Sequence, residues 1–110
     1  MLMEVLDGNG NPLTISVQTQ QPTTDYSNTL VADQVEQQIV PPNPNRAGLL
    51  FQNKGNAPMY ISDVSNAGAG DPASFIVQPN QYWPPPCYPI PITAITVAGS
   101  IGQAFVYREW

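Results

Sequence analysis

The sequence predicts an all-β fold, an antiparallel β-sandwich or jelly-roll-like barrel of about seven to eight short strands. Two observations lead to this prediction. The 13 prolines and 8 glycines among 110 residues are spread so that no long window keeps a helical apolar period. Short segments in which apolar and polar residues alternate recur instead, separated by turn-forming residues at about 8–12 residue intervals.

The segments expected to form strands follow in chain order: 2–6, 13–17, 35–39, 49–52, 59–61, 75–77, 93–98 and 103–108. Three pairs of these strands are expected to form hairpins through the connections 7–12, 53–56 and 99–102. These connections are rich in Gly, Asn and Asp, which tolerate the positive φ angles of tight turns. The alternation also predicts the core, whose expected members are Phe51, Met59, Ile61, Ile95, Val97 and Phe105.

Two further segments are not expected to form central strands. Residues 18–30 are polar and have no period, which favours an extended arm that lets residues 1–17 pack on a neighbouring subunit, or else an ordinary long loop. Residues 79–91 hold six of the 13 prolines, so they are expected along a sheet edge or over a sheet end. The resulting division is an N-terminal hairpin and polar arm at 1–30 and a β-sandwich domain at 31–110.

The charge of the chain excludes several kinds of partner. The net charge is −5, and the only cations are Arg46, Lys54 and Arg108. Nucleic acids and anionic membranes need clusters of Lys or Arg, so neither is an expected partner. Only 10% of the residues are charged, which either makes the surface easy to desolvate against other protein or leaves it merely polar.

The residue types give no support for catalysis, so we expect no enzyme activity, no cofactor and no metal. Histidine is absent, which removes the usual general base and the commonest zinc ligand. Cys87 has no basic neighbour in sequence to activate its thiol. The run Asp-Gly-Asn-Gly-Asn at 7–11 opens like a calcium loop, but Pro12 and Gln18 replace the glycine and the bidentate glutamate that such a loop requires.

Several side chains are instead candidates for contact with a partner. Tyr82, Trp83 and Tyr88 lie in the proline-rich run and either anchor a protein, stack on a sugar, or pack on prolines. Arg46 follows a turn and could bind a carboxylate or carbonyl groups, within the subunit or across an interface. The full set of interface candidates is Tyr26, Arg46, Tyr82, Trp83, Tyr88, Arg108 and Trp110. We expect Trp110 at the rim of a subunit interface.

Five parts of residues 23–110 form a pattern: Asp-Tyr-Ser at 25–27, Asn-Pro-Asn-Arg-Ala-Gly-Leu-Leu-Phe-Gln-Asn at 43–53, Met-Tyr-Ile at 59–61, three prolines at 84–86 and Arg-Glu-Trp at 108–110. Together they resemble small virion proteins of tailed phages. The resemblance implies a virion component, either a capsid decoration (cement) protein or a module of a head or tail fibre. It implies no catalytic residues.

The resulting expectation is a capsid-decorating homo-oligomer, such as a trimer, bound to the major capsid protein or another virion protein. The alternatives are a receptor- or glycan-binding module of a fibre, or a neck or tail adaptor subunit. The start of the sequence has no signal-peptide pattern, and no run approaches about 20 apolar residues. These features predict synthesis in the host cytoplasm, and the resemblance implies the capsid surface of the virion as the expected location.

Overall fold

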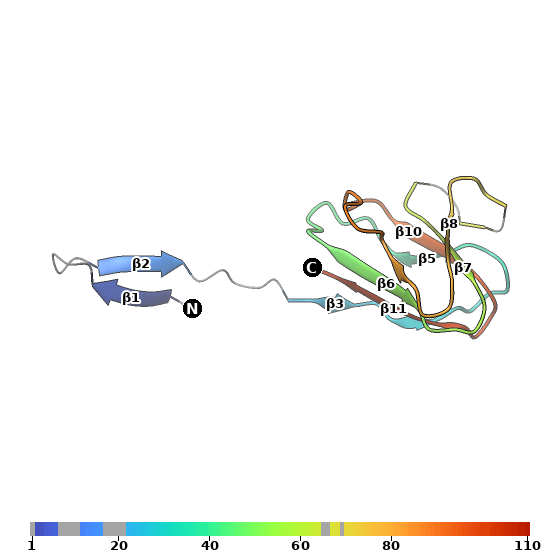
Figure 1. The fold of residues 1–110 in the computed structure, drawn as a ribbon, viewed down its shortest axis with the longest axis horizontal. Helices are drawn as coiled ribbons and strands as arrows, with labels where there is room; N and C mark the ends of the chain where they lie inside the picture. The colour runs from blue at the N-terminus through green and yellow to red at the C-terminus, as the bar shows by residue number, and fades with distance from the viewer. Residues whose placement is uncertain (1, 7–11, 17–21, 65–66, 69) are drawn as a thin grey trace.

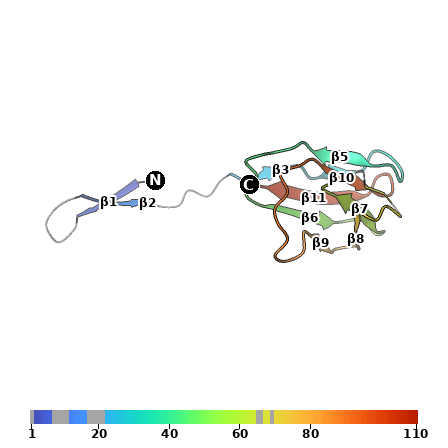
Figure 2. The ribbon, with the colours of Figure 1, turned by 90° about the horizontal axis from the view of Figure 1, so that it is seen from above.

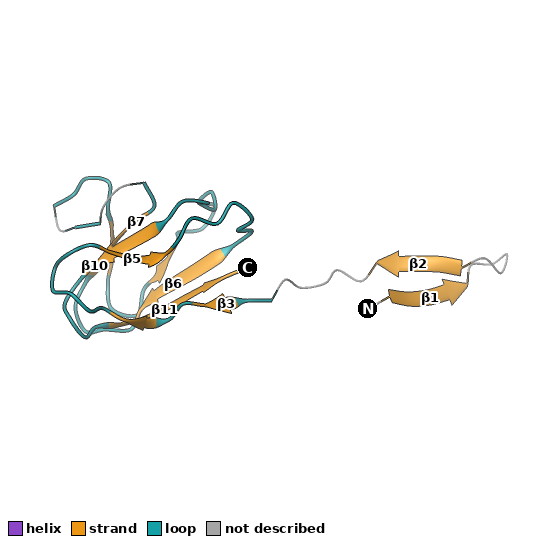
Figure 3. Cartoon of the chain, turned by 180° about the vertical axis from the view of Figure 1, so that it is seen from behind, coloured by secondary structure: helices purple, strands orange, loops and turns teal. Residues whose placement is uncertain are grey.

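The computed structural model describes residues 2–6, 12–16, 22–64, 67–68 and 70–110, and within them the chain consists of strands and loops (Figure 3). The strands are β1 (Leu2–Leu6), β2 (Pro12–Ser16), β3 (Thr24–Asp25), β4 (Asn28–Thr29), β5 (Gln37–Val40), β6 (Leu49–Asn53), β7 (Met59–Ser62), β8 (Phe75–Val77), β9 (Tyr82–Trp83), β10 (Ile95–Ala98) and β11 (Ala104–Glu109). None of these residues forms a helix long and apolar enough to cross a membrane. The predicted all-β class is confirmed.

Two antiparallel sheets form the sandwich, and a separate β1–β2 hairpin lies apart from it (Figure 1). One sheet has the order β3-β11-β6-β9, with β4 also paired to β11, and the other has the order β5-β10-β7-β8. Because β3 and β4 pair with opposite ends of β11, they act as one interrupted first strand. Numbering onward from it, the two sheets read 1-8-3-6 and 2-7-4-5, which is the strand order of a jelly roll.

Two of the three expected hairpins are wrong. β6 and β7 lie in different sheets, as do β10 and β11, so the connections at 53–56 and 99–102 cross the core. Alternation cannot show whether two successive strands are neighbours in one sheet or lie in two facing sheets. A strand buries the same alternate residues in both arrangements. The third hairpin is confirmed by the β1–β2 ladder, from Leu2 opposite Ser16 to Leu6 opposite Pro12; its connection at 7–11 and Val17 lie outside the described residues.

Buried amides hold the crossing connections in place. The Asn53 side chain is fully buried and its Nδ2 donates to the carbonyls of Ala57 and Val77, at 2.8 and 2.9 Å. Gln103, also buried, donates through Nε2 to Asn53 Oδ1 at 3.3 Å. Since these amides satisfy carbonyl groups where the chain changes sheets, they favour a crossing over a tight hairpin.

The segment at 18–30 differs from the expectation over its described part, 22–30. Thr24–Asp25 and Asn28–Thr29 form β3 and β4, and the intervening Tyr26 donates its N–H to the Tyr107 carbonyl at 2.9 Å. Both strands are exposed and polar, so they contribute backbone hydrogen bonds without an apolar period that the sequence would reveal. The sandwich sheet therefore begins before the expected boundary at residue 31.

The proline-rich run lies where it was expected. Tyr82–Trp83 forms β9 at the edge of its sheet, and the following residues lead to β10 in the other sheet. The predicted core is also confirmed, since its six members are at most 5% exposed. The remaining members of this core are Leu30, Val40, Leu49, Val77, Trp83 and Tyr107.

Candidate docking face

The sheet that contains β6, β9 and β11 leaves a row of side chains on the side away from the core. Burial alternates along these strands, so every second residue points outward. The strand register places Gln52 opposite both Tyr82 and Val106, and Leu50 opposite Arg108. We call this surface the outer face and define it by Leu50, Gln52, Tyr82, Ala104, Val106, Arg108 and Trp110.

Large apolar groups on the outer face are accessible to solvent. Leu50 is 38% exposed, Trp110 is 43% exposed and Tyr82 is 60% exposed. Scattered apolar residues are common on any protein surface, but here they share one sheet face that carries a single cation, Arg108. Such a face loses little hydration energy when another protein covers it.

The one cation on this face has a carboxylate directly opposite. Asp25 pairs with Arg108 in the ladder between β3 and β11. The pKa of Asp25 lies below its usual value because the Ser27 side chain and backbone hydrogen-bond to the carboxylate, and the Arg108 charge adds a smaller lowering. The Asp25 carboxylate thus offsets the charge of Arg108, so this part of the outer face is not a cationic patch.

Two features of Gly48 hold Trp110 on the outer face: its backbone hydrogen bonds to Trp110 and its lack of a side chain. The Trp110 N–H donates to the Gly48 carbonyl at 3.0 Å, and the Gly48 N–H donates back at 3.1 Å, which continues the β6–β11 ladder. A Cβ atom on Gly48 would lie 2.4 Å from Cε2 of the indole. Glycine at this position therefore makes room for the Trp110 ring against the strand.

Arg46 points inward and makes its contacts within the subunit. Its Nη1 donates to the carbonyls of Pro91 and Thr93 at 2.6 and 2.9 Å, and its Nη2 donates to the Pro41 carbonyl at 3.1 Å. Its Nε forms an ion pair with Glu109 Oε1 at 3.1 Å, and both side chains are almost fully buried. Arg46 thus joins two loops to the last strand.

Glu109 receives further donors around this ion pair. Asn43 Nδ2 donates to Oε2 at 2.7 Å, and the Tyr107 hydroxyl donates to Oε1 at 2.9 Å. Burial, and then the hydrogen bond to Glu109, raise the pKa of Tyr107 well above its ordinary value of 10.0. The network is internal and complete, which is typical of a structural ion pair.

The aromatic residues of the proline-rich run separate into two environments. Trp83 is 2% exposed and contacts Tyr88 and Phe75, with ring centroids 5.6 and 5.9 Å away. Tyr88 is half-buried, and its hydroxyl donates to Asp63 Oδ2 at 2.8 Å. Tyr82 is the one ring of the three that points to solvent.

The structure therefore brings together only part of the predicted set. Tyr82, Arg108 and Trp110 share the outer face, whereas Arg46, Trp83 and Tyr88 pack inside the subunit. Tyr26 is half-buried with its ring edge against Tyr107, at a centroid distance of 6.0 Å. Sequence reasoning missed Leu50 and Val106; the signal was their alternation with the predicted core residues Phe51 and Phe105.

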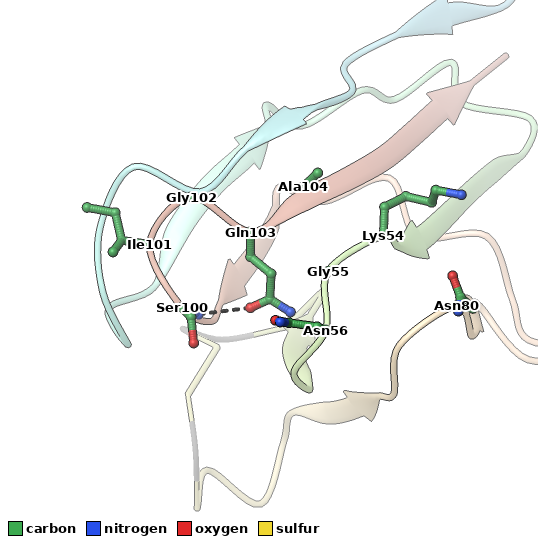
Figure 4. Close-up of a pocket in the computed structure, with 9 residues that line it drawn as sticks. All are labelled: Lys54, Gly55, Asn56, Asn80, Ser100, Ile101, Gly102, Gln103 and Ala104. Carbon is green, nitrogen blue, oxygen red and sulfur yellow. Dashed lines mark hydrogen bonds between the residues drawn. The ribbon is translucent and has the colours of Figure 1, made fainter.

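A hollow lies where the connections after β6 and β10 meet, with Asn80 on its far side (Figure 4). The Gln103 side chain in its lining is already hydrogen-bonded to backbone groups of the subunit. Gln103 Oε1 accepts the Ser100 N–H at 3.0 Å, and Gln103 Nε2 also donates to the Ala57 carbonyl. Lys54 is the one cation in the lining, so the hollow offers no cluster of charged groups to a ligand.

The fold and its exposed groups define a jelly-roll sandwich whose most distinctive surface is a partly aromatic sheet face with Arg108 as its one cation. No family model, no curated protein and no solved structure matches the chain. Function must therefore be argued from the surfaces themselves.

Proposed function

We propose that this chain is a non-enzymatic structural protein of a tailed-phage virion, which decorates or cements the capsid by docking its outer face on major capsid subunits. The observation that carries the proposal is the accessible row of Leu50, Tyr82 and Trp110 on one sheet face. The sequence resemblance of residues 23–110 to small virion proteins supplies the virion as the setting.

The free energy of docking would come from covering this face. Specific interfaces commonly bury about 800 Å² on each partner, and aromatic side chains provide much of their energy. Several modest contacts made at once by an oligomer hold far more tightly than one contact does, because later contacts are intramolecular. A decoration protein of this kind stabilises the shell by binding across the joints between capsid subunits.

The distribution of charge supports a protein partner over a nucleic acid. Arg46 forms a buried ion pair with Glu109, Lys54 lines the hollow between the connections after β6 and β10, and Arg108 lies opposite Asp25. No two of these cations form a stripe that could follow a phosphate backbone. The glycan-binding alternative gains no specific support, because Tyr82 is the one ring of the aromatic run that is free to stack on a sugar.

The test uses phage particles assembled without this chain, through deletion of its gene. The purified chain is added, and free and bound protein are separated by density-gradient sedimentation. We expect the wild-type chain to co-sediment, and Leu50→Asp and Tyr82→Asp each to weaken binding at least about tenfold, equivalent to about 1.4 kcal/mol. Gln38→Asp, at an exposed position of β5 in the other sheet, is the matched control and should bind like wild type.

Cryo-electron microscopy of the reconstituted particle then locates the bound subunits. Density over the capsid shell supports the proposal. Density at the neck or fibres, no binding at all, or undiminished binding of both outer-face variants would overturn it.

A further inference from the structure

The edge strand β8 is unusually open to pairing with another strand. Its three residues, Phe75–Val77, are all apolar, and Phe75 and Ile76 are 37% and 58% exposed. Exposed edges are usually protected by a charge, a proline or a bulge. β3 has Asp25, β5 is followed directly by Pro41 and β9 is followed directly by Pro84. In contrast, neither the three residues of β8 nor its direct neighbours Ser74 and Gln78 are charged or proline, and the ladder between β7 and β8 has no register shift.

The β1–β2 hairpin, in turn, pairs with no other strand of the described residues. Its two strands pair with each other. A two-stranded sheet alone is marginally stable in water, because it buries little apolar surface. Figure 1 shows this hairpin away from its own sandwich.

The register makes one face of the hairpin entirely apolar. Met3 is opposite Ile15, and Val5 is opposite Leu13, two residues further along. Residues at alternate positions of a ladder share a face, so these four residues occupy the same side. The rungs between and beyond them place a mixed set on the other side: the polar residues Glu4, Thr14 and Ser16 together with Leu2, Leu6 and Pro12.

The topology separates this hairpin from the β8 edge of its own subunit. The chain enters the sandwich at β3, and Figure 2 shows β3 and β5 along one side and β8 and β9 along the other. The eight residue steps from Ser16 to Thr24 span at most about 29 Å. The two short dimensions of the molecule are 23 and 22 Å. A connection that runs from β3 around the outside of the sandwich therefore uses up its reach before the hairpin can lie alongside β8 of the same subunit.

We propose that the β1–β2 hairpin of one subunit adds to the β8 edge of a second copy of this chain. The acceptor sheet would then continue from β5-β10-β7-β8 into the two strands of the neighbour. The apolar face of the hairpin would cover Phe75, next to its ring contacts with Trp83 and Tyr88. Backbone pairing provides the geometry, and the apolar face provides the burial that the isolated hairpin lacks.

This association is head-to-tail, because each copy donates a hairpin and accepts another at a different site. Such interfaces close into a ring when the rotation between copies permits, and otherwise continue as a filament. The proposal goes beyond docking to a capsid, since it concerns self-association of the chain, and it uses an edge distinct from the outer face.

Complementation between two variants tests the proposal. Val5→Asp disables the donor hairpin, and Ile76→Lys adds a protective charge to the acceptor edge. Each variant alone should be monomeric by light scattering at micromolar concentrations, where the wild-type chain is oligomeric. An equimolar mixture should form a one-to-one dimer, because Ile76→Lys still has an intact hairpin and Val5→Asp still has an intact edge.

Ser16→Asp is the matched control, since it adds the same charge on the opposite face of the hairpin and should leave the oligomer unchanged. Circular dichroism confirms that each variant keeps its sheet content. A monomeric wild-type chain, either single variant that oligomerises normally, or a mixture that stays monomeric would refute the proposal. The particle-binding result with Leu50→Asp is a separate readout, so failure here would leave the capsid proposal standing.

Discussion

Replacing Arg46 with methionine should cost the fold a large part of its stability. The substitution keeps an unbranched apolar stem but removes the ion pair to Glu109 and the hydrogen bonds to three backbone carbonyls. Breaking one partner of a buried pair typically costs about 3–5 kcal/mol, because the remaining charge stays buried. We therefore expect a loss of about 4 kcal/mol from a total that is typically about 5–15 kcal/mol.

Urea unfolding followed by tryptophan fluorescence measures this loss. The midpoint should fall while the slope with denaturant stays constant, because the surface exposed on unfolding is unchanged. The thermal midpoint should drop by about 15 °C or more for a domain of this size. Lys54→Met removes an exposed cation and is the control, with an expected change within about 0.5 kcal/mol.

A double-mutant cycle with Glu109→Gln tests the cause. Glutamine keeps an oxygen that can accept from Tyr107 or Asn43 but removes the buried charge. In the Arg46→Met background it should therefore recover stability, whereas in the wild-type chain it should reduce stability. Additive effects of the two substitutions, or a loss below about 1 kcal/mol for Arg46→Met, would refute the buried-pair reasoning.

Two further predictions concern Tyr107 and Gly48. The pKa of Tyr107 is raised in the folded state, first by burial and then by the hydrogen bond to Glu109. Tyr107 therefore contributes its full amount to the free energy of unfolding below about pH 10, and this contribution is lost as the pH rises above that value. Tyr107→Phe should lessen this alkaline fall in the urea midpoint; an unchanged fall would contradict it. Gly48→Ala should displace the Trp110 indole and increase acrylamide quenching of tryptophan fluorescence, at a cost of about 1–2 kcal/mol. Gly68→Ala is the control, because nothing lies within 4 Å of its added Cβ, and equal quenching in the two variants would count against the packing argument.

The sequence was informative about burial and uninformative about which strands are neighbours. Phe51 and Phe105 were recognised as core residues because alternation reports which face of a strand is buried. The same alternation could not show that β6 and β7 face each other across the core, since that depends on long-range pairing. β3 and β4 escaped detection because they are two residues long and contribute only exposed polar positions.

The residues of the outer face were likewise only partly predictable from the sequence. Tyr82 and Trp110 were recognisable as large rings in unusual positions, and both are accessible. Trp83 shares that sequence context, yet it is buried because adjacent residues of a strand point to opposite faces. Leu50 lies in the hydrophobic run Leu-Leu-Phe at 49–51, where only the strand geometry shows that the middle residue points outward.

The buried ion pair and the outer face are connected through β11. Glu109 points inward to Arg46, while Arg108 and Trp110 on either side of it belong to the outer face. Arg46 also fixes the carbonyls of Pro41, Pro91 and Thr93, so the loops around this end of the sheet are set by the same guanidinium. A face that docks by shape needs its last strand held in one position. Arg46→Met should therefore weaken particle binding even at temperatures where the variant is folded, although the Arg46 side chain is buried within the subunit. Binding that stays at the wild-type level in the folded variant would show that the outer face keeps its shape without this support.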